Sequence, residues 1–363
     1  MRKGILIFQL ATIFVGSIVG AGLSSGRELN QFFSTYGYKG FIGLLICALL
    51  YIVVGKMIID ISIKYNVNSY NEFISLVCPR AVAAFTNTVL TLFLLSSTSI
   101  ILAGSSAVVH QYFGIPKWIG LILMITVSVF FLLKNTKGLF EVNSVIVPIL
   151  ITVMTAIFIG YVMNNSGQLS LDYLMELPVT KKKWGGSSII YAGFNIISIV
   201  GIIVPLANEL KEPKVLVKGV IWGTIILTIM SGYITFLMMV NPSYAIRYEI
   251  PILAIATKIG SGLQIALLAV IWLEMFSSQI SNIYSLTRCL ESKFKISYKK
   301  GIFICLVIAA PFSMIGFSKL VDFLYPLYGV LSLAFVVCCI MFYMRDKVSI
   351  TYKKANKKKY IRS

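Results

Sequence analysis

Inside the first hydrophobic segment of this chain, residues Gly16 to Glu28 read G-S-I-V-G-A-G-L-S-S-G-R-E. Four glycines and three serines in thirteen residues disfavour a continuous helix, because each glycine inside a helix costs about 1 kcal/mol relative to alanine. The residues on both sides are apolar enough for a lipid bilayer. A helix that breaks inside a membrane is tolerated where its freed carbonyl and amide groups line a cavity or contact a ligand. We therefore predict a broken membrane helix whose break forms part of a binding site.

The composition is typical of a helical membrane protein. Of the 363 residues, 58% are hydrophobic and 12% are charged, and the mean hydropathy is +0.89. Several apolar runs reach about 20 residues, which is the length of a helix that crosses a bilayer. The predicted fold class is all-α, a polytopic membrane protein with ten transmembrane helices. In chain order, the predicted spans are 5–36, 40–64, 80–113, 117–133, 139–162, 186–209, 215–240, 251–288, 301–315 and 321–344.

The basic residues predict how the chain is oriented. The net charge is +19, from 32 Lys and Arg against 13 Asp and Glu. With a cytoplasmic N-terminus, most of these basic residues fall on the cytoplasmic side, among them Lys134, Lys137 and the stretch from Lys353 to Arg362. The positive-inside rule therefore predicts a multi-pass plasma-membrane protein with both termini in the cytoplasm. We interpret the basic tail as an orientation signal that contacts anionic lipid, and we expect no nucleic-acid partner.

The residue patterns of enzymes and metal sites are missing from the sequence. Its six cysteines have no C-x-x-C spacing and lie mostly inside predicted spans, which indicates apolar packing. The single histidine, His110, lies at the end of the third span. The sequence contains no G-x-S-x-G, phosphate-loop or H-E-x-x-H motif. We therefore predict that the protein is not an enzyme, has no catalytic residues and carries no cofactor.

An internal repeat relates the two halves of the chain. A shift of 181 positions places Ser17–Gly20 on Ser198–Gly201 and Glu28 on Glu209. The same shift lays spans two to five on spans seven to ten. Because five spans is an odd number, the second half enters the membrane from the opposite side, so the two repeats are inverted. The single transporter domain, 1–363, then divides into repeat one at 5–162, repeat two at 186–344 and the basic cytoplasmic tail at 345–363.

The repeat predicts two broken helices at corresponding places. The first helix breaks around Gly16–Gly22, and the sixth around Gly193–Gly201, where Asn195 and Ser198 supply polar side chains. Interrupted segments at corresponding places in two halves are typical of the substrate site of a secondary transporter.

The pattern G-x-x-V-G-x-G from Gly16 to Gly22 resembles the unwound first helix of the neurotransmitter:sodium symporter family. That family has the five-plus-five inverted-repeat fold of the bacterial leucine transporter. The whole chain resembles the YkvI-type bacterial membrane proteins, which are grouped with those symporters, and the resemblance covers all ten spans in topology. It implies a symporter that moves a small amino acid or related zwitterion by alternating access, with Na⁺ as the coupling ion.

The resemblance also implies a sodium site between the first and eighth helices. In the family, carbonyls beside the first-helix break hold the ion together with a carbonyl and two hydroxyls of the eighth helix, whose spacing Glu274–Ser278 shares. The implied ligands are the carbonyl oxygens of Gly16, Val19 and Glu274 and the hydroxyls of Ser277 and Ser278. Such oxygen atoms suit a hard monovalent cation, although serine pairs also serve helix packing in membranes.

The predicted substrate site lies between the breaks and the eighth helix. Gly20 takes the place of an acidic residue found in monoamine carriers of the family, and the free space there suits a substrate carboxylate. A second family sodium site is not expected, because Leu23 stands where that site has Asn. The substrate-binding candidates are Ser17, Gly20, Gly22, Tyr191, Phe194, Asn195, Ser198 and Glu274.

The gating candidates are charged residues near the ends of the broken helices. The family's outer-gate arginine aligns with Gly26, and Arg27 follows it by one position. Arg27 and Glu28 continue the first helix towards the outside and are candidates for an outer gate. Glu209 ends the sixth helix towards the cytoplasm and is a candidate for an inner gate. Charges at the ends of spans also serve as interfacial anchors, and this interpretation stays open.

Glu274 is the only acidic residue near the middle of a predicted span, where an unpaired charge is costly. It is a candidate for proton coupling, for cation binding or for binding a substrate amine. A buried carboxyl kept protonated by neighbours such as Ser278 or Tyr284 is the structural alternative. A proton-coupled amino acid or amine transporter therefore stays an alternative to sodium coupling, and so does a nutrient or germinant sensor that does not transport. The predicted partners are a small-molecule substrate and the lipid bilayer, and the oligomeric state is left open.

Overall fold

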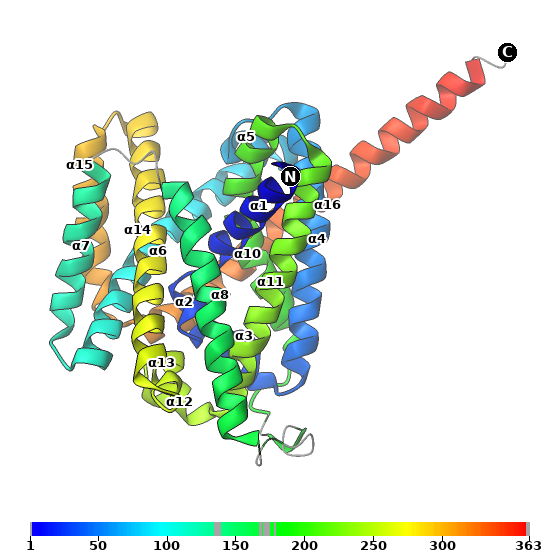
Figure 1. The fold of residues 1–363 in the computed structure, drawn as a ribbon. Coiled ribbons are helices and arrows are strands. Elements are labelled where there is room, and N and C mark those ends of the chain that lie inside the picture. Colours follow the sequence, from blue (N-terminus) through cyan, green and yellow to red (C-terminus); the bar gives the residue numbers. More distant parts are fainter. Residues whose placement is uncertain (1, 134–138, 167–168, 170–174, 178, 361–363) are drawn as a thin grey trace.

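The first hydrophobic segment is an interrupted helix (Figure 1). The computed structural model describes residues 2–133, 139–166, 169, 175–177 and 179–360. The helix breaks at Val19 and Gly20, as predicted, and Gly26, with a φ angle of +81°, makes a second turn. The pieces of this segment are α1 (Arg2–Ile18), α2 (Ala21–Ser24), α3 (Arg27–Phe32) and the 3-10 turn η1 (Ser34–Tyr36).

Each remaining predicted span contains one long helix. These are α4 (Lys39–Tyr65), α6 (Arg80–Phe113), α7 (Lys117–Leu133), α8 (Leu139–Asn164), α10 (Trp184–Leu210), α11 (Pro213–Val240), α14 (Ser261–Phe294), α15 (Tyr298–Ser313) and α16 (Phe317–Tyr360). The short helices are α5 (Tyr70–Val77), α12 (Pro242–Arg247) and α13 (Pro251–Ala256). Among the described residues, seven helices are long and apolar enough to cross a membrane, and α1 and α7 are shorter apolar helices. The chain is therefore an all-α, multi-pass membrane protein.

Helix α10 corrects one prediction. We expected a break around Gly193–Gly201, but the helix is continuous across these residues. Gly193 serves close packing instead, since a Cβ atom there would lie 2.9 Å from Leu333 Cδ2 and 3.2 Å from the Gly329 carbonyl oxygen of α16. The absence of a side chain lets α10 approach α16 closely, so this glycine is explained without an opening of the helix.

The packing of the helices follows a two-repeat organisation. When each helix of the first half is exchanged for its counterpart in the second, one observed contact becomes another. The contact of α1 with α11 becomes that of α10 with α4, and the contact of α6 with α7 becomes that of α14 with α15. In the same way, α1 with α8 becomes α10 with α16. Equivalent halves thus share one core, as a five-plus-five repeat requires. The bounds of the two repeats stay a prediction.

Helix α16 leaves the bundle towards the C-terminus (Figure 1). It continues the last span into the basic tail as far as Tyr360. Of the basic residues used to predict orientation, Lys134, Lys137 and Arg362 lie outside the described residues. The placement of both termini in the cytoplasm stays a prediction.

Candidate functional site

The break after α1 interrupts the helical hydrogen bonds of the backbone. The Val19 amide donates to the Val15 carbonyl at 2.8 Å, and the Ser24 amide donates to the Gly20 carbonyl at 3.0 Å. Between these two bonds, in a stretch that the structure describes completely, no backbone hydrogen bond joins the amides of residues 20–23 to the carbonyls of residues 16–19. Two predicted sodium ligands, the carbonyl oxygens of Gly16 and Val19, therefore lack helical partners, as a cation site there would need.

Helix α14 brings its predicted ligands to one side. Positions 274, 277 and 278 fall within about 100° on a helical wheel. Glu274 and Ser277 are buried and Ser278 is half-buried, while α14 packs against α2, α6 and α8. The helix runs unbroken through Glu274, so its carbonyl oxygen already accepts within the helix and has one lone pair left. The donor set of carbonyl and hydroxyl oxygens fits a sodium ion in chemical type. Its role as an ion site stays a prediction.

The Glu274 side chain is fully buried, and neither of its carboxyl oxygens has a hydrogen-bond partner. Ser278 and Tyr284, named as neighbours that could hold this carboxyl protonated, therefore do not bond to it. Tyr284 is ten positions further along α14, about 15 Å in a helix, and is 38% exposed. Gln279 on the same helix is also buried, with both amide atoms unpaired. Sequence reasoning missed Gln279, which lies outside the Glu274–Ser278 spacing.

Three of the four α10 candidates are buried. Asn195 donates to the Tyr51 hydroxyl at 3.0 Å and to the Tyr191 carbonyl at 3.2 Å, so its amide group already serves contacts within the protein. Phe194 stacks on Tyr325 of α16, with ring centroids 4.5 Å apart, and meets the edge of Phe93 of α6 at 5.4 Å. Phe194 thus belongs to an aromatic layer that joins three helices.

Phe93 and Tyr325 were not predicted. Both lie inside apolar spans, and no local motif sets them apart from lipid-facing aromatic residues. The fourth α10 candidate, Ser198, is half-buried and lies one turn beyond the aromatic layer towards the end of α10.

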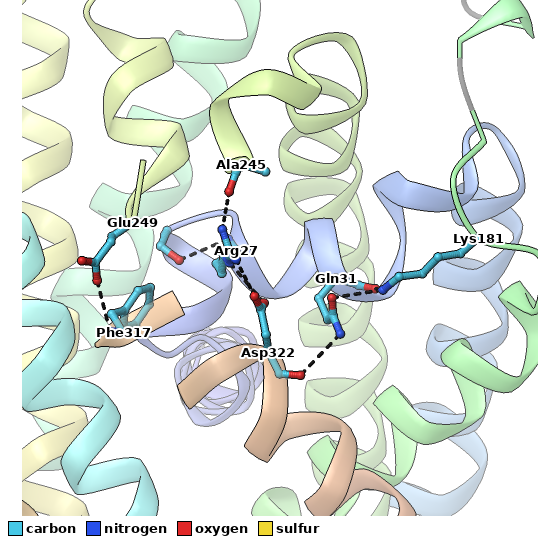
Figure 2. Close-up of polar contacts among 8 residues, drawn as sticks. Arg27, Gln31, Lys181, Ala245, Glu249, Phe317 and Asp322 are labelled. Atoms are coloured by element: carbon cyan, nitrogen blue, oxygen red, sulfur yellow. Dashed lines mark hydrogen bonds and ion pairs between the residues drawn. The ribbon is translucent and has the colours of Figure 1, made fainter. Parts of the chain in front are cut away.

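Arg27 forms an ion pair with Asp322 on the side of the break where α2 and α3 lie (Figure 2). Its Nε atom donates to Asp322 Oδ1 at 3.1 Å, and a second guanidinium nitrogen pairs with Asp322 Oδ2. A third contact joins the guanidinium to the Ala245 carbonyl of α12. A two-bond contact between arginine and a carboxylate is strong and directional, so Arg27 ties α3 to α16 and α12. Its partner Asp322 was missed, although it lies at the start of the tenth predicted span.

Neighbouring contacts reinforce the connection between α3 and α16. Lys181 donates to Gln31 Oε1 at 3.0 Å, and Gln31 donates to the Asp322 carbonyl at 3.4 Å (Figure 2). Burial lowers the pKa of Lys181 from its ordinary value, although nearby Asp322 acts in the opposite direction. The Ile252 amide also donates to the Ser25 carbonyl at 3.1 Å. The segment that carries α12 and α13 is thereby fixed over the end of the broken helix.

The other gating candidates have different surroundings. Glu28 is 2% exposed and turned away from the Arg27 contact, and its Oε1 atom has no hydrogen-bond partner. Glu209 is exposed at the end of α10. Neither residue takes part in an ion pair within the described part of the chain. Of the three candidates, the structure brings only Arg27 into an ion pair, and the gating role of all three stays a prediction.

The opposite side of the break borders an apolar cavity between α1, α4, α10 and α11. Its volume is about 20 Å³, enough for one water molecule. Ser17 lines it, together with Phe14, Ile203 and Val220. Ser17 and Gly20 are half-buried, whereas Gly22 is buried. Of the substrate candidates on the first span, Ser17 therefore lies on the cavity side of the break and Gly22 on the side of the ion pair.

Comparison with known proteins places this bundle in a family. No family model matches the chain. It is 31% identical to the uncharacterized membrane protein YkvI of Bacillus subtilis (strain 168) over 333 residues, which cover 90% of this chain and 93% of YkvI. The chain belongs to the YkvI family. A second relative from the same organism, YyaD, is 26% identical to this YkvI-family protein over 340 residues, covering 92% and 96% of the two chains.

Solved structures share the fold at low sequence identity. A Na⁺-coupled sialic acid symporter superposes with a TM-score of 0.63 at 15% identity, over 85% of the YkvI-family chain and 72% of the symporter. MhsT in complex with L-phenylalanine gives 0.59 at 17% identity, over 90% and 87%. Mhp1, a nucleobase-cation-symport-1 family transporter, gives 0.55 at 14% identity, over 88% and 74%. The YkvI-family protein therefore has the fold of the leucine-transporter-like proteins.

Proposed function

We propose that this YkvI-family protein is a secondary active symporter that moves a small amino acid or related zwitterion by alternating access, with Na⁺ as the coupling ion. One observation carries the proposal: the backbone carbonyls of Gly16 and Val19 are left without helical partners inside the bundle. Unsatisfied carbonyls at that depth are costly unless a ligand or an ion completes them. The sodium-coupled sialic acid symporter and the phenylalanine-bound MhsT support the proposal through their shared fold.

In this proposal the ion links the break to α14. The carbonyls of Gly16 and Val19 bind it from one side, and the Glu274 carbonyl with the hydroxyls of Ser277 and Ser278 from the other. An ion that contacts both elements favours the conformation in which they are close. Substrate bound beside the break shares that conformation, so binding of the ion and of the substrate is coupled.

Alternating access then uses the two sides of the break. On one side, Arg27 and Asp322 close the route with an ion pair. On the other, Ser17 remains half-buried beside the apolar cavity. This combination fits a conformation closed at the Arg27 side, which we propose is the outer side. Opening would separate Arg27 from Asp322, and the cavity side would close around α1 and α10.

A proton-coupled version is favoured by a separate observation, the buried and unbonded carboxyl of Glu274. A carboxyl in such a place is far less costly when it is neutral, so a cycle of proton uptake and release is the chemistry available to it. In this version Glu274 carries the coupling proton, and the hydroxyls of Ser277 and Ser278 serve packing.

Reconstituted vesicles decide between these possibilities. Purified protein in proteoliposomes would be supplied with radiolabelled amino acids, under a sodium gradient, a proton gradient or neither. We expect accumulation that requires sodium, with a loss of about tenfold in sodium affinity for Ser277→Ala, since a ligand oxygen is removed. Ser285→Ala is the matched control, because its hydroxyl bonds only within α14, to the Ser281 carbonyl at 2.9 Å.

The contrary outcomes are specific. Accumulation that follows the proton gradient and disappears in Glu274→Gln would replace sodium by protons. Binding of an amino acid without accumulation would contradict transport and favour a sensor.

A further inference from the structure

Next to Arg27 in the chain, the buried carboxyl group of Glu28 has no oppositely charged partner. Glu28 follows Arg27 on α3, about 100° further around the helix. It is 2% exposed, Oε1 has no hydrogen-bond partner, and no ion pair in the described part of the chain includes it. An acidic oxygen buried without a donor is costly, so a protein retains one where a ligand supplies the donor.

A second unpaired oxygen lies at the same place. Tyr191 of α10 is 2% exposed, and its O–H lies close enough to Glu28 to act as a donor to that carboxyl, although the contact falls outside normal hydrogen-bond geometry. The Tyr191 ring is fixed by Phe32 and Phe33, whose centroids are 5.0 Å and 4.9 Å away. Glu28 Oε1 and the Tyr191 hydroxyl, from two different helices, are thus held in position, and neither makes a hydrogen bond of normal geometry.

The carboxyl also faces the break itself. A Cβ atom on Gly22 would lie 2.5 Å from Glu28 Oε2 and 2.6 Å from Cε2 of Tyr325, so the carboxyl and the tyrosine ring flank the same side of Gly22. Phe194 stacks on that ring. Two residues earlier, a Cβ on Gly20 would meet no atom within 4 Å. The Glu28 carboxyl is therefore bordered by aromatic rings, and free space lies beside the break.

We propose that Glu28 and Tyr191 bind the protonated primary or secondary amine of the substrate, with the rings of Tyr325 and Phe194 beside it. The carboxylate supplies the opposite charge, both oxygens accept N–H bonds, and the ring faces attract a cation. A quaternary ammonium group has no N–H for these acceptors, and two oxygens are too few for a sodium ion. The inference rests on the proposed function and assigns recognition of the amine to Glu28 in place of Glu274.

Binding measurements on the full-length protein in lipid nanodiscs test this site. The probes are the twenty L-amino acids and, for each one that binds, its nitrogen-free carboxylic acid and its decarboxylated amine. We expect amine-bearing probes to bind and the nitrogen-free acids to fail. Glu28→Gln should weaken amine binding about 30-fold or more, because the partner charge is removed. Tyr191→Phe keeps the ring packing and should weaken binding by about three- to tenfold.

Two controls keep the test informative. Glu291→Gln removes an exposed carboxyl that pairs with Arg288, and it should leave the affinity unchanged. The melting temperature of each variant without probe reports folding. If Glu28→Gln does not fold, Tyr191→Phe and the nitrogen-free acids still decide the proposal.

The proposal is overturned if Glu28→Gln binds amines as the natural protein does, if the nitrogen-free acids bind equally well, or if no amine probe binds. Uptake into proteoliposomes separates this site from the proposed function. Accumulation that Glu28→Gln leaves intact would retain the transporter and remove the amine site. Binding that depends on Glu28 without any accumulation would retain the amine site and remove transport.

Discussion

Two glycine-containing segments at equivalent places in the two halves have different structures. The first span breaks at Val19 and Gly20, where Gly20 is extended, with φ −130° and ψ −168°. Its counterpart α10 carries Gly193 and Gly201 and remains helical from Trp184 to Leu210. Both segments are apolar, and Gly20 and Gly201 stand at equivalent positions under the shift of 181. Glycine therefore lowers the free-energy cost of a helix break in both halves, while the side chains packed around it decide whether the helix opens.

The neighbours differ in kind. At Gly22, the missing side chain makes room for the polar group of Glu28 and the ring of Tyr325. At Gly193, it makes room for Leu333 and the backbone of α16, a packing contact between two intact helices. In the proposed site, the charged group therefore comes from the first span, while the intact α10 supplies aromatic rings and the Tyr191 hydroxyl. An inverted repeat can share its packing between the halves and still place its binding groups unequally.

The largest expected effect comes from Gly22→Ala, which would sharpen this comparison. The new methyl group would lie 2.5 Å from Glu28 Oε2 and 2.6 Å from Tyr325 Cε2, so both side chains must move. We expect uptake to fall about tenfold or more, in line with the cost of overpacking a filled site. Gly201→Ala in α10 is the control, because nothing lies within 4 Å of its Cβ position. Equal uptake rates for the two variants would break the comparison.

A second test compares the gating candidates at the two ends of the proposed transport route, the Arg27–Asp322 ion pair and Glu209. Arg27→Gln, Asp322→Asn and the double variant form a cycle in which thermal stability is measured for the purified protein. We expect a coupling of about 1–2 kcal/mol, because the contact is two-bonded but partly open to solvent. Glu209→Gln, at the other end, should leave stability unchanged, since Glu209 is exposed. Additive effects of Arg27→Gln and Asp322→Asn would argue against an energetic closure.

The role of Asn195 distinguishes a wall from a binding residue. Its amide donates to Tyr51 and to the Tyr191 carbonyl. Asn195→Ala should therefore lower the free energy of unfolding by about 1–2 kcal/mol, with the substrate KM of uptake little changed. Tyr51→Phe should partly remove this penalty, because the orphaned hydroxyl is then absent. A raised KM at unchanged stability would instead assign Asn195 to the substrate.

The smallest effect is expected for Gly193→Ala. The closest atom to its Cβ position is the end of the Leu333 side chain, which can move, while alanine favours the helix. The two effects oppose each other, and we expect a change in stability within about 1 kcal/mol, measured by thermal unfolding. A larger loss would mean that α10 and α16 have no freedom to adjust, and that their contact is as demanding as the one at Gly22.

Local properties alone determined much of this protein. Hydropathy over windows of about 20 residues gave the membrane class and the order of the spans. The glycine-rich stretch Gly16–Gly22 predicted the break, since backbone propensity acts within a few residues. The spacing from Glu274 to Ser278 placed oxygen-bearing groups on one side of a helix, because helical periodicity is also a local property.

Only the tertiary structure decided how these local elements meet. It closed the helix around Gly193, because α16 fills the space beside that residue. It paired Arg27 with Asp322 across 295 positions and turned the adjacent Glu28 inward towards Gly22. Such choices depend on which side chains from distant segments fill the same space. The sequence by itself therefore determined where the chain can break, and long-range packing decided which break forms and which charges are left without partners.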